Sequence, residues 1–235
     1  MKKWKLKKKD KKLIFGIIAL IVVALVQWLF GTGGEDIAHA VSVDQVPQWS
    51  KAPYAIINEN VPLFDREDLV AESYEYYGKL DSLGRCTVTM ACIGPDLMPR
   101  EDRGEIGSVK PTGWVQNFYE GVDGGALYNR CHLIGFQLTG ENANKENLIT
   151  GTRYMNVDGM LPFEDQVAQY IKSTGNHVLY RVTPIFEGDE LVARGVQMEA
   201  QSIEDDGKGV QFHVFVYNVQ PGIVIDYATG ENWEK

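Results

Sequence analysis

The 235-residue chain is 44% hydrophobic and 23% charged, a composition that excludes a disordered or low-complexity protein and allows one sizeable domain, or two small ones, with a buried core. The net charge of −9 is unevenly distributed, because residues 1–12 hold eight lysines and one aspartate and carry +7, which leaves −16 on residues 13–235. The basic end and the acidic body are therefore expected to face different environments.

The first predicted element is a membrane-spanning helix at residues 13–30, LIFGIIALIVVALVQWLF, in which Gln27 is the only strongly polar side chain. At about 1.5 Å per residue, a helix of this length just crosses a hydrocarbon core. The lysine tract before it favours a cytoplasmic tail at residues 1–12, by the positive-inside rule. The alternative for that tract is an arm that binds nucleic acid.

A cleaved signal peptide is the alternative to this signal anchor, because Ala38-His39-Ala40 has the A-x-A form that a signal peptidase accepts. The apolar run is longer than the usual signal sequence, and the tripeptide lies well downstream of it, which favours the uncleaved anchor. The body is then expected outside the cell membrane, or secreted after cleavage near Ala40. Residues 31–53 are expected to be a spacer, and residues 54–235 the folded domain.

The folded part is expected to be an α+β domain with a mostly antiparallel central sheet. Helices are predicted at residues 65–77 and 163–173, the second beginning near Pro162 and ending at Gly175. Residues 94–113 read as a surface loop, and residues 204–209 as a hairpin turn rather than a calcium loop. Runs rich in β-branched and apolar residues predict extended segments at 54–58, 85–93, 127–136, 148–152, 177–186, 191–200, 211–218 and 223–227.

Three cysteines are an odd number for an exported chain, so at least one is free or pairs with another molecule. Cys86 and Cys92 lie in one strand-like run, about 20 Å apart if extended, and cannot bridge each other there. A bond from Cys131 to one of them and three buried free thiols both remain open.

The stretch from residue 128 to residue 164 concentrates the polar side chains that could carry chemistry. His132 is expected on the first of two extended segments, Asn147 beside the second, and Asn156 and Glu164 near the entry to the following helix. Histidine is suited to take a proton from water, and an asparagine oxygen is a good ligand for a hard cation. Arginines there would stabilise charge on a phosphate. Composition alone also allows structural roles for each of them.

The motifs NRCHLIG at residues 129–135 and NLITGTRYMN at residues 147–156 resemble those of DNA/RNA non-specific endonucleases of the ββα-metal, or His-Me finger, class. The resemblance is particularly to streptococcal-type secreted or membrane-anchored DNases, which include DNA-entry nucleases, and it extends over about residues 54–227. The resemblance implies a ββα-metal element packed on the central sheet. It also implies an endonuclease that uses Mg²⁺, with Mn²⁺ as a substitute, to hydrolyse DNA or RNA without sequence preference.

The same resemblance assigns roles to individual residues. His132 matches the histidine that acts as general base, and Asn156 matches the asparagine that holds the magnesium ion. Asn147 takes a supporting position near the site. Glu164 corresponds to a glutamate that contacts metal-bound water. Residues 54–235 would then be the nuclease domain.

Two arginines also have expected roles, and two residues differ from the family's motif. Arg130 matches the motif arginine, which orients or assists catalysis, and Arg153 is placed to contact a phosphate. Asn129 stands where the family's motif has aspartate, and Cys131 stands where it has glycine, so fine tuning is expected to differ more than the reaction itself.

The charge of −16 on the body argues against a strong affinity for a polyanion, since such binding is usually driven by lysine and arginine. A local cluster could outweigh the total charge. The alternative function is an exported module that binds nucleic acid or a host protein without cutting, and no motif identifies a protein partner. The basic residues expected to gather around the site are Lys110, Arg130, Lys145, Arg153, Lys172 and Arg181.

Overall fold

The computed structural model describes residues 40–235. The predicted cytoplasmic tail, the predicted anchor at residues 13–30 and the first part of the predicted spacer lie outside the described residues. From residue 40 to the C-terminus, no helix is long and apolar enough to cross a membrane.

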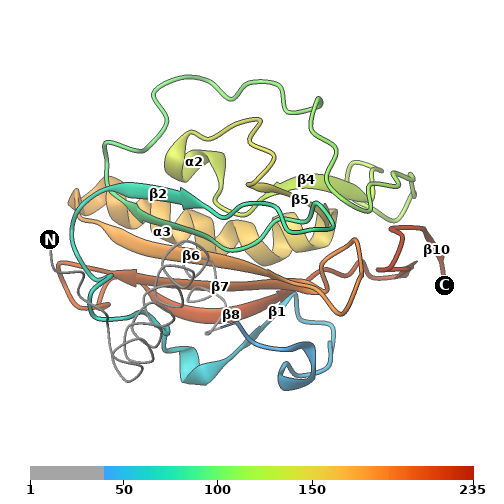
Figure 1. Cartoon of the computed structure of the whole chain (residues 1–235), viewed down its shortest axis with the longest axis horizontal. Coiled ribbons are helices and arrows are strands. Elements are labelled where there is room, and N and C mark those ends of the chain that lie inside the picture. Colours follow the sequence, from blue (N-terminus) through green and yellow to red (C-terminus); the bar gives the residue numbers. More distant parts are fainter. Residues whose placement is uncertain (1–39) are drawn as a thin grey trace, which may run out of the picture. The chain divides into compact units, whose positions relative to one another are not determined.

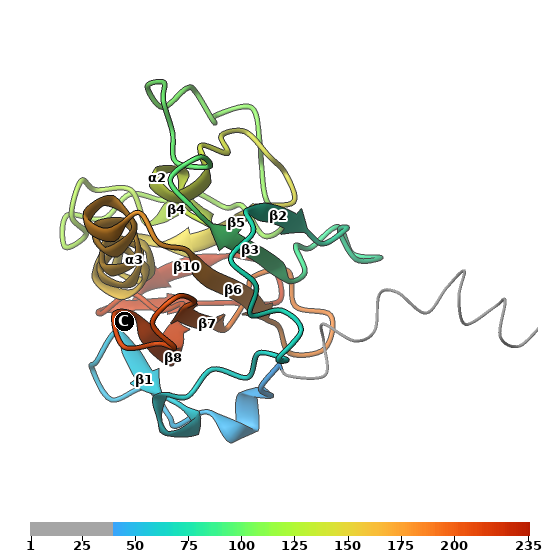
Figure 2. The same cartoon turned by 90° about the vertical axis from the view of Figure 1, so that its left-hand side faces the viewer.

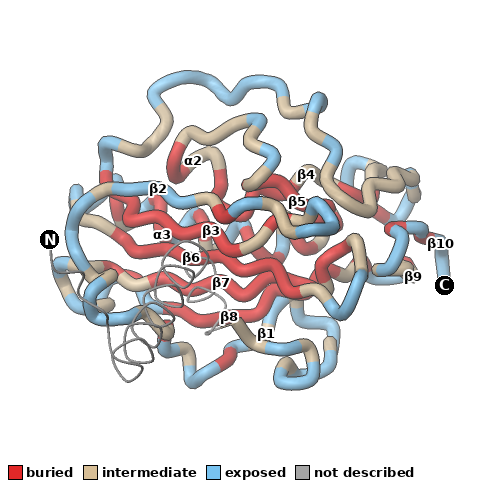
Figure 3. The backbone as a smooth tube through the Cα atoms, viewed as in Figure 1, coloured by how far each residue is buried: buried red, intermediate tan, exposed pale blue. Residues whose placement is uncertain are grey.

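A six-stranded antiparallel sheet forms the centre of the domain, in the order β1-β8-β7-β6-β3-β2 (Figure 1). The prediction of an α+β domain with a mostly antiparallel sheet is confirmed. The three long strands in the middle are almost entirely buried (Figure 3), because both faces of the sheet are covered. The strands are β1 (Tyr54–Ile56), β2 (Tyr74–Tyr77), β3 (Thr89–Ile93), β6 (Val178–Ile185), β7 (Gly195–Ser202) and β8 (Gln211–Tyr217).

One face of the sheet is covered by helix α3 (Leu161–Thr174) (Figure 2). Its buried residues Val167, Ala168 and Ile171 recur at helical spacing and belong to the main hydrophobic core. Pro162 lies in the first turn, and Gly175 ends the helix in the left-handed conformation with φ 73°. The helix predicted at residues 163–173 is therefore confirmed.

The opposite face of the sheet is covered by residues 40–53, which the sequence analysis places in the spacer. Apolar side chains of this segment, including Trp49, pack against Ile57, Ile185 and Phe215. The backbone nitrogen of Val41 donates to Oε1 of Gln197 at 2.8 Å. The spacer boundary at residue 53 therefore differs from the structure, because the apolar residues before Tyr54 gain a buried surface on the sheet.

The helix predicted at residues 65–77 is wrong. Residues 74–77, with the sequence YEYY, instead form strand β2 at the edge of the sheet, and Tyr74 lies opposite Cys92 on β3. Aromatic residues favour a strand where a neighbouring edge is open to pairing. Pairing with β3 therefore outweighs the local preference of this segment for a helix.

Two short turns and a hairpin complete the fold. A 3-10 turn, η1 (Val43–Gln45), and a second, η2 (Asn58–Asn60), lie in the N-terminal segment. Strands β9 (Ile223–Ile225) and β10 (Asn232–Glu234) pair as a separate hairpin.

All three cysteines are buried free thiols, and burial raises the pKa of Cys86 to about 12 and that of Cys92 to about 11.

Candidate active site

The site is built on a two-stranded hairpin followed by a helix. Strand β4 (Tyr128–His132) pairs antiparallel with β5 (Leu148–Thr152), and His132 lies opposite Leu148. The chain then passes through a π-helical turn, η3 (Met155–Met160), into α3. This is the strand, strand, helix order that the sequence predicts, although Phe136 begins the short helix α2 (Phe136–Thr139) instead of extending β4.

Five of the six predicted site residues line one pocket of about 390 Å³ between β4, α2 and α3. They are His132, Asn156, Glu164, Arg130 and Arg153. The sixth, Asn147, is fully buried outside the pocket, where its amide accepts from the Ile134 nitrogen and donates to the Ile134 oxygen, both at 2.9 Å. Asn147 thus fixes the turn that follows His132.

His132 is held by the backbone carbonyl of Asn142, whose oxygen lies 2.8 Å from Nε2. A carbonyl only accepts a hydrogen bond, so Nε2 carries the hydrogen and Nδ1 keeps its lone pair. Burial lowers the pKa of His132, and the charge of Arg103 lowers it further, against an opposing effect of the Asn142 carbonyl. The imidazole is therefore neutral near pH 7 and able to accept a proton at Nδ1.

Arg103 is a site residue that the sequence patterns do not predict. Its Nη2 atom lies 3.4 Å from Nδ1 of His132, and its side chain lines the same pocket. It comes from the loop that arches over α2 (Figure 1), where six charged residues between positions 100 and 110 made no single one stand out. No local pattern there could have identified Arg103.

Asn156 is oriented by Asn129, the residue at the position of the motif aspartate. Nδ2 of Asn156 donates to Oδ1 of Asn129 at 3.1 Å, which leaves the Asn156 side-chain oxygen for another partner. The π-helical turn that carries Asn156 packs tightly on β8, because Gly159 lies against Val216 where a Cβ would collide. A π-helical turn of this kind is frequent at functional sites.

Glu164 lies in the first turn of α3, and only 9% of its surface is exposed. Burial raises its pKa to about 7. Gly135 makes room for this carboxylate, because a Cβ at residue 135 would lie 2.5 Å from Oε2 of Glu164. The glycine of the NRCHLIG motif is thus required by a side chain of the following helix.

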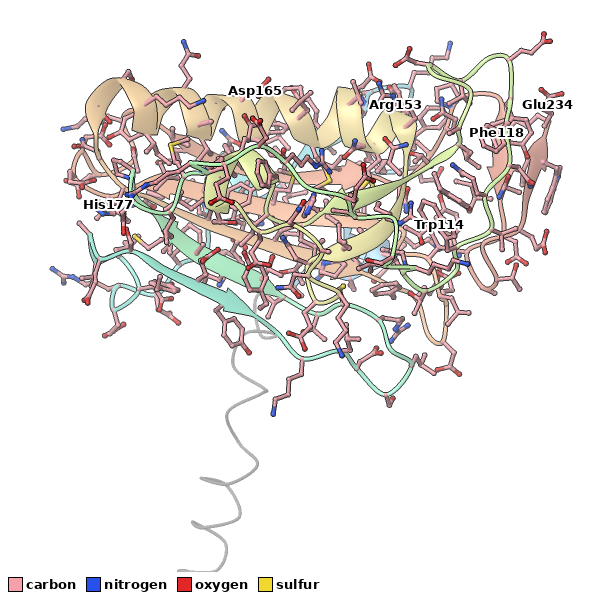
Figure 4. The ribbon with its side chains drawn as sticks, turned by 90° about the horizontal axis from the view of Figure 1, so that it is seen from above. Trp114, Phe118, Arg153, Asp165, His177 and Glu234 are labelled. Carbon is pink, nitrogen blue, oxygen red and sulfur yellow. The ribbon has the colours of Figure 1, made fainter. Side chains whose placement is uncertain are left out.

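The two predicted arginines differ in how available their guanidinium groups are to a substrate. Arg153 donates from Nε at 3.0 Å and from Nη2 at 2.8 Å to one oxygen of Asp123, in an exposed ion pair. Arg130 donates to the carbonyl of Gly107 at 3.1 Å, and its guanidinium lies 4.3 Å from the ring centre of Trp114. Figure 4 shows Arg153 and Trp114 on the same side of the molecule. Arg130 therefore fastens a loop, whereas Arg153 holds an exposed and replaceable partner.

The expected cluster of basic residues forms only in part. The cations that line the pocket are Arg103, Arg130 and Arg153. Arg181 is buried on the sheet with its Nε 2.8 Å from Oε2 of Glu199, so its expected place near the site is wrong. Because Arg181 lies on a core strand, its charge is paired with Glu199 inside the fold and does not reach the surface around the site.

The pocket's donor atoms fit a hard cation such as Mg²⁺. Asn156 offers an amide oxygen and Glu164 a carboxylate, which are ligands that Mg²⁺ accepts while water and substrate oxygens fill its other positions. Between residues 40 and 235, no group of three or more His, Cys, Asp and Glu side chains is placed to hold a metal ion. Two oxygen donors from the protein leave the other positions around such an ion to water and substrate oxygens.

Comparison with known proteins identifies the relatives of this chain. The sequence model of the DNA/RNA non-specific endonuclease family matches residues 67–204. A deoxyribonuclease of Streptococcus dysgalactiae subsp. equisimilis is 36% identical over 109 residues, which is 44% of this chain and 32% of the relative. The match therefore spans about a third of that curated relative.

Solved structures share the fold over most of the chain. NucA from Streptococcus agalactiae with magnesium bound is 24% identical, with a TM-score of 0.71 over 83% of this chain and 92% of NucA. The Sda1 nuclease with a bound zinc ion is 25% identical, with a TM-score of 0.65 over 80% of this chain and 100% of Sda1.

Proposed function

The chain belongs to the DNA/RNA non-specific endonuclease family, and on that premise we propose that it is an exported, Mg²⁺-dependent endonuclease that cuts DNA, and RNA as a second substrate, without sequence preference. One observation carries the proposal. A neutral histidine with its Nδ1 lone pair facing a pocket shares that pocket with an asparagine oxygen, a buried carboxylate and three arginines.

His132 is the general base of the proposed reaction. Nδ1 accepts a proton from the attacking water, while the bond from Nε2 to the Asn142 carbonyl holds the ring in place and stabilises the charge that forms on it. In the free protein Arg103 donates to Nδ1. A phosphate in the pocket offers Arg103 a stronger partner, so substrate binding itself would clear the base.

Asn156 would hold the Mg²⁺ ion directly, and Glu164 would contact its water ligands. When bound, the ion supplies Lewis-acid stabilisation of the phosphate and of the leaving oxygen. Arg103 and Arg153 neutralise charge on the phosphate in the transition state. By its resemblance to the family, the reaction is expected to leave a 5′-phosphate and a 3′-hydroxyl.

The choice of cation draws support from the relatives and from the donor atoms. NucA was solved with magnesium and Sda1 with zinc, which supports a divalent metal in this family of sites. The hard oxygen donors Asn156 and Glu164 favour Mg²⁺ over zinc, with Mn²⁺ as a substitute.

The N-terminal sequence supports export. We propose residues 1–12 as a cytoplasmic tail and residues 13–30 as a single-pass anchor that holds the nuclease domain outside the cell membrane. Protease added to intact cells should digest the domain while residues 1–12 stay protected. Release of a soluble form that begins near residue 41 would instead support signal-peptide cleavage.

A plasmid assay separates a nuclease from a module that only binds. The full-length chain, purified in mild detergent, is incubated with supercoiled plasmid in Mg²⁺ and then in EDTA. The proposal predicts nicked and linear DNA in Mg²⁺ and intact plasmid in EDTA. A shift in plasmid mobility without any nicking would identify a binding module instead.

A further inference from the structure

The loop that delivers Arg103 is weakly supported. Residues 98–106, which we call the strap, cross the outside of α2 without regular secondary structure (Figure 1), and residues 100–105 are all exposed. Behind the strap lies a hollow of about 540 Å³, lined by residues 96–102 together with Phe136, Thr139, Gly140 and Asn142. Met98 at the start of the strap packs against the main hydrophobic core, but the exposed residues 100–105 gain little stability from packing against the domain.

Apart from the contact of Arg103 with His132, hydrogen bonds hold the strap at one point before residue 106. In the described part of the chain, the backbone of residues 98–105 makes no hydrogen bond with another backbone group. In the amide orientation that gives both of its atoms a partner, Asn142 accepts from the Gly104 nitrogen at 2.9 Å and donates to the Gly104 oxygen at 3.2 Å. A side chain at residue 104 would collide with this amide, so glycine permits the contact.

The same residue also holds the base. The backbone carbonyl of Asn142 accepts from Nε2 of His132, while its side chain grips the residue next to Arg103. Arg103 in turn reaches Nδ1 of His132. These contacts form a closed circuit in which Asn142 links the base to the strap.

We propose that the Asn142 side chain is a positioning residue that sets Arg103 against His132 and the substrate phosphate by clamping the strap at Gly104. The inference rests on the nuclease function proposed above, but the clamp itself is a property of the fold. Because an arginine misplaced by about 1 Å can cost about 100-fold in rate, loss of the clamp should reduce catalysis without touching any reacting group.

Asn142→Ala isolates the clamp, because the substitution leaves the backbone carbonyl that holds His132. We expect kcat/KM for DNA cleavage to fall by about 10- to 100-fold. Asn144→Ala is the matched control: it lies in the same turn, and its Oδ1 accepts only from the Glu146 nitrogen at 2.9 Å. The control should retain wild-type activity and stability.

Coupling to Arg103 distinguishes positioning from a general loss of structure. In the wild-type background, Arg103→Ala should lower kcat/KM more than Asn142→Ala does. In a protein that already carries Asn142→Ala, the Arg103→Ala substitution should lower kcat/KM much less. Gly104→Ala provides a second way to open the clamp and should reproduce the effect of Asn142→Ala. Additive losses in the double variant would overturn the proposal, as would wild-type activity in both single clamp variants.

Two further readouts do not depend on nuclease activity. Trypsin should cleave after Arg100 and Arg103 faster in Asn142→Ala and Gly104→Ala than in Asn144→Ala or the wild type, with the fragments identified by mass. Because the Arg103 charge lowers the pKa of His132, release of the strap should raise that pKa, as measured by NMR.

The outcomes separate the clamp from the function. Faster strap cleavage in a chain that does not cut DNA would uphold the clamp and reject the proposed nuclease. Unchanged strap cleavage together with an unchanged His132 pKa, in an active nuclease, would overturn the clamp and leave the function standing.

Discussion

Nε2 of His132 lies 2.8 Å from the backbone oxygen of Asn142. Because the partner is a carbonyl, the contact fixes the tautomer and directs the Nδ1 lone pair to the pocket that Asn156 and Glu164 share. The backbone supplies this contact, so no substitution at residue 142 other than one that moves the chain would remove it. The main chain thus sets the tautomer and orientation of His132, whereas burial and Arg103 lower its pKa.

The activity should depend on pH through His132. Burial and Arg103 lower the pKa of this residue, and the base acts only when it is deprotonated, so kcat/KM should rise with pH through a midpoint below that of a free histidine, about 6.5. Bound Mg²⁺ favours the ionised form of Glu164, so activity should be level near pH 7. The measurement is kcat/KM against pH at a fixed Mg²⁺ concentration. An acid limb centred above pH 7 would contradict the geometry described for this residue.

Asn156→Ala should abolish metal binding while the fold persists. A ligand that binds only the folded state raises the melting temperature by mass action, so Mg²⁺ should stabilise the wild type and leave the variant unchanged. Differential scanning calorimetry with and without Mg²⁺ makes the comparison. The control is Asn176→Ala, because Asn176 lies just beyond the C-terminal end of α3 and its amide donates to the Tyr170 hydroxyl. Equal stabilisation of Asn156→Ala and the wild type would place the metal elsewhere.

Glu164→Gln should stabilise the metal-free protein at high pH. The folded state raises the pKa of Glu164 from 4.5 to about 7, so the folded state favours the protonated carboxyl, and the cost to stability builds up as the pH rises from about 4.5 to about 7. The cost is at most about 3 kcal/mol. The amide of the Glu164→Gln variant has no charge to bury. Chemical denaturation should therefore give the variant a larger free energy of unfolding than the wild type at pH 8, and the difference should vanish near pH 4. A variant that is less stable than the wild type at pH 8 without metal would show that the contact of the carboxylate with Gln137 outweighs the cost of burying its charge.

Gly135→Ala should disturb the site through Glu164. The added Cβ would lie 2.5 Å from Oε2 of Glu164, and relief of that overlap should cost about 1–3 kcal/mol in the free energy of unfolding. Gly107→Ala is the control, because a Cβ there meets no atom within 4 Å. Urea denaturation of the two variants tests the contact. The loss should shrink in Gly135→Ala/Glu164→Ala, where the obstructing carboxylate is gone.

Much of the fold follows from local patterns. Pro162, the apolar spacing of α3 and Gly175 define the helix, and alternating β-branched residues locate the central strands. The two catalytic candidates His132 and Asn156 could be placed on neighbouring elements, because a hairpin brings its strands together whatever surrounds it.

The remaining features depend on contacts between distant parts of the chain. Residues 74–77 are a strand because β3 leaves an edge open, and residues 40–53 are ordered because the sheet offers them an apolar surface. Arg181 pairs with Glu199 across two strands. Arg103 reaches the site from a loop that contacts Asn142 at Gly104. No window of sequence contains both partners of any of these contacts, so residue types and spacing could not predict them.

The central claim is that His132 is the base of a metal-dependent nuclease, and the cleavage rate of His132→Ala tests it most directly. Its control is His177→Ala, which removes a histidine that bonds Glu204 at the far end of the molecule from Arg153 (Figure 4). With saturating DNA and Mg²⁺, and with matching circular dichroism spectra, His132→Ala should cut about 10²- to 10⁴-fold more slowly than the wild type, and His177→Ala should cut at the wild-type rate. Cleavage by a folded His132→Ala variant at near the wild-type rate would contradict the account.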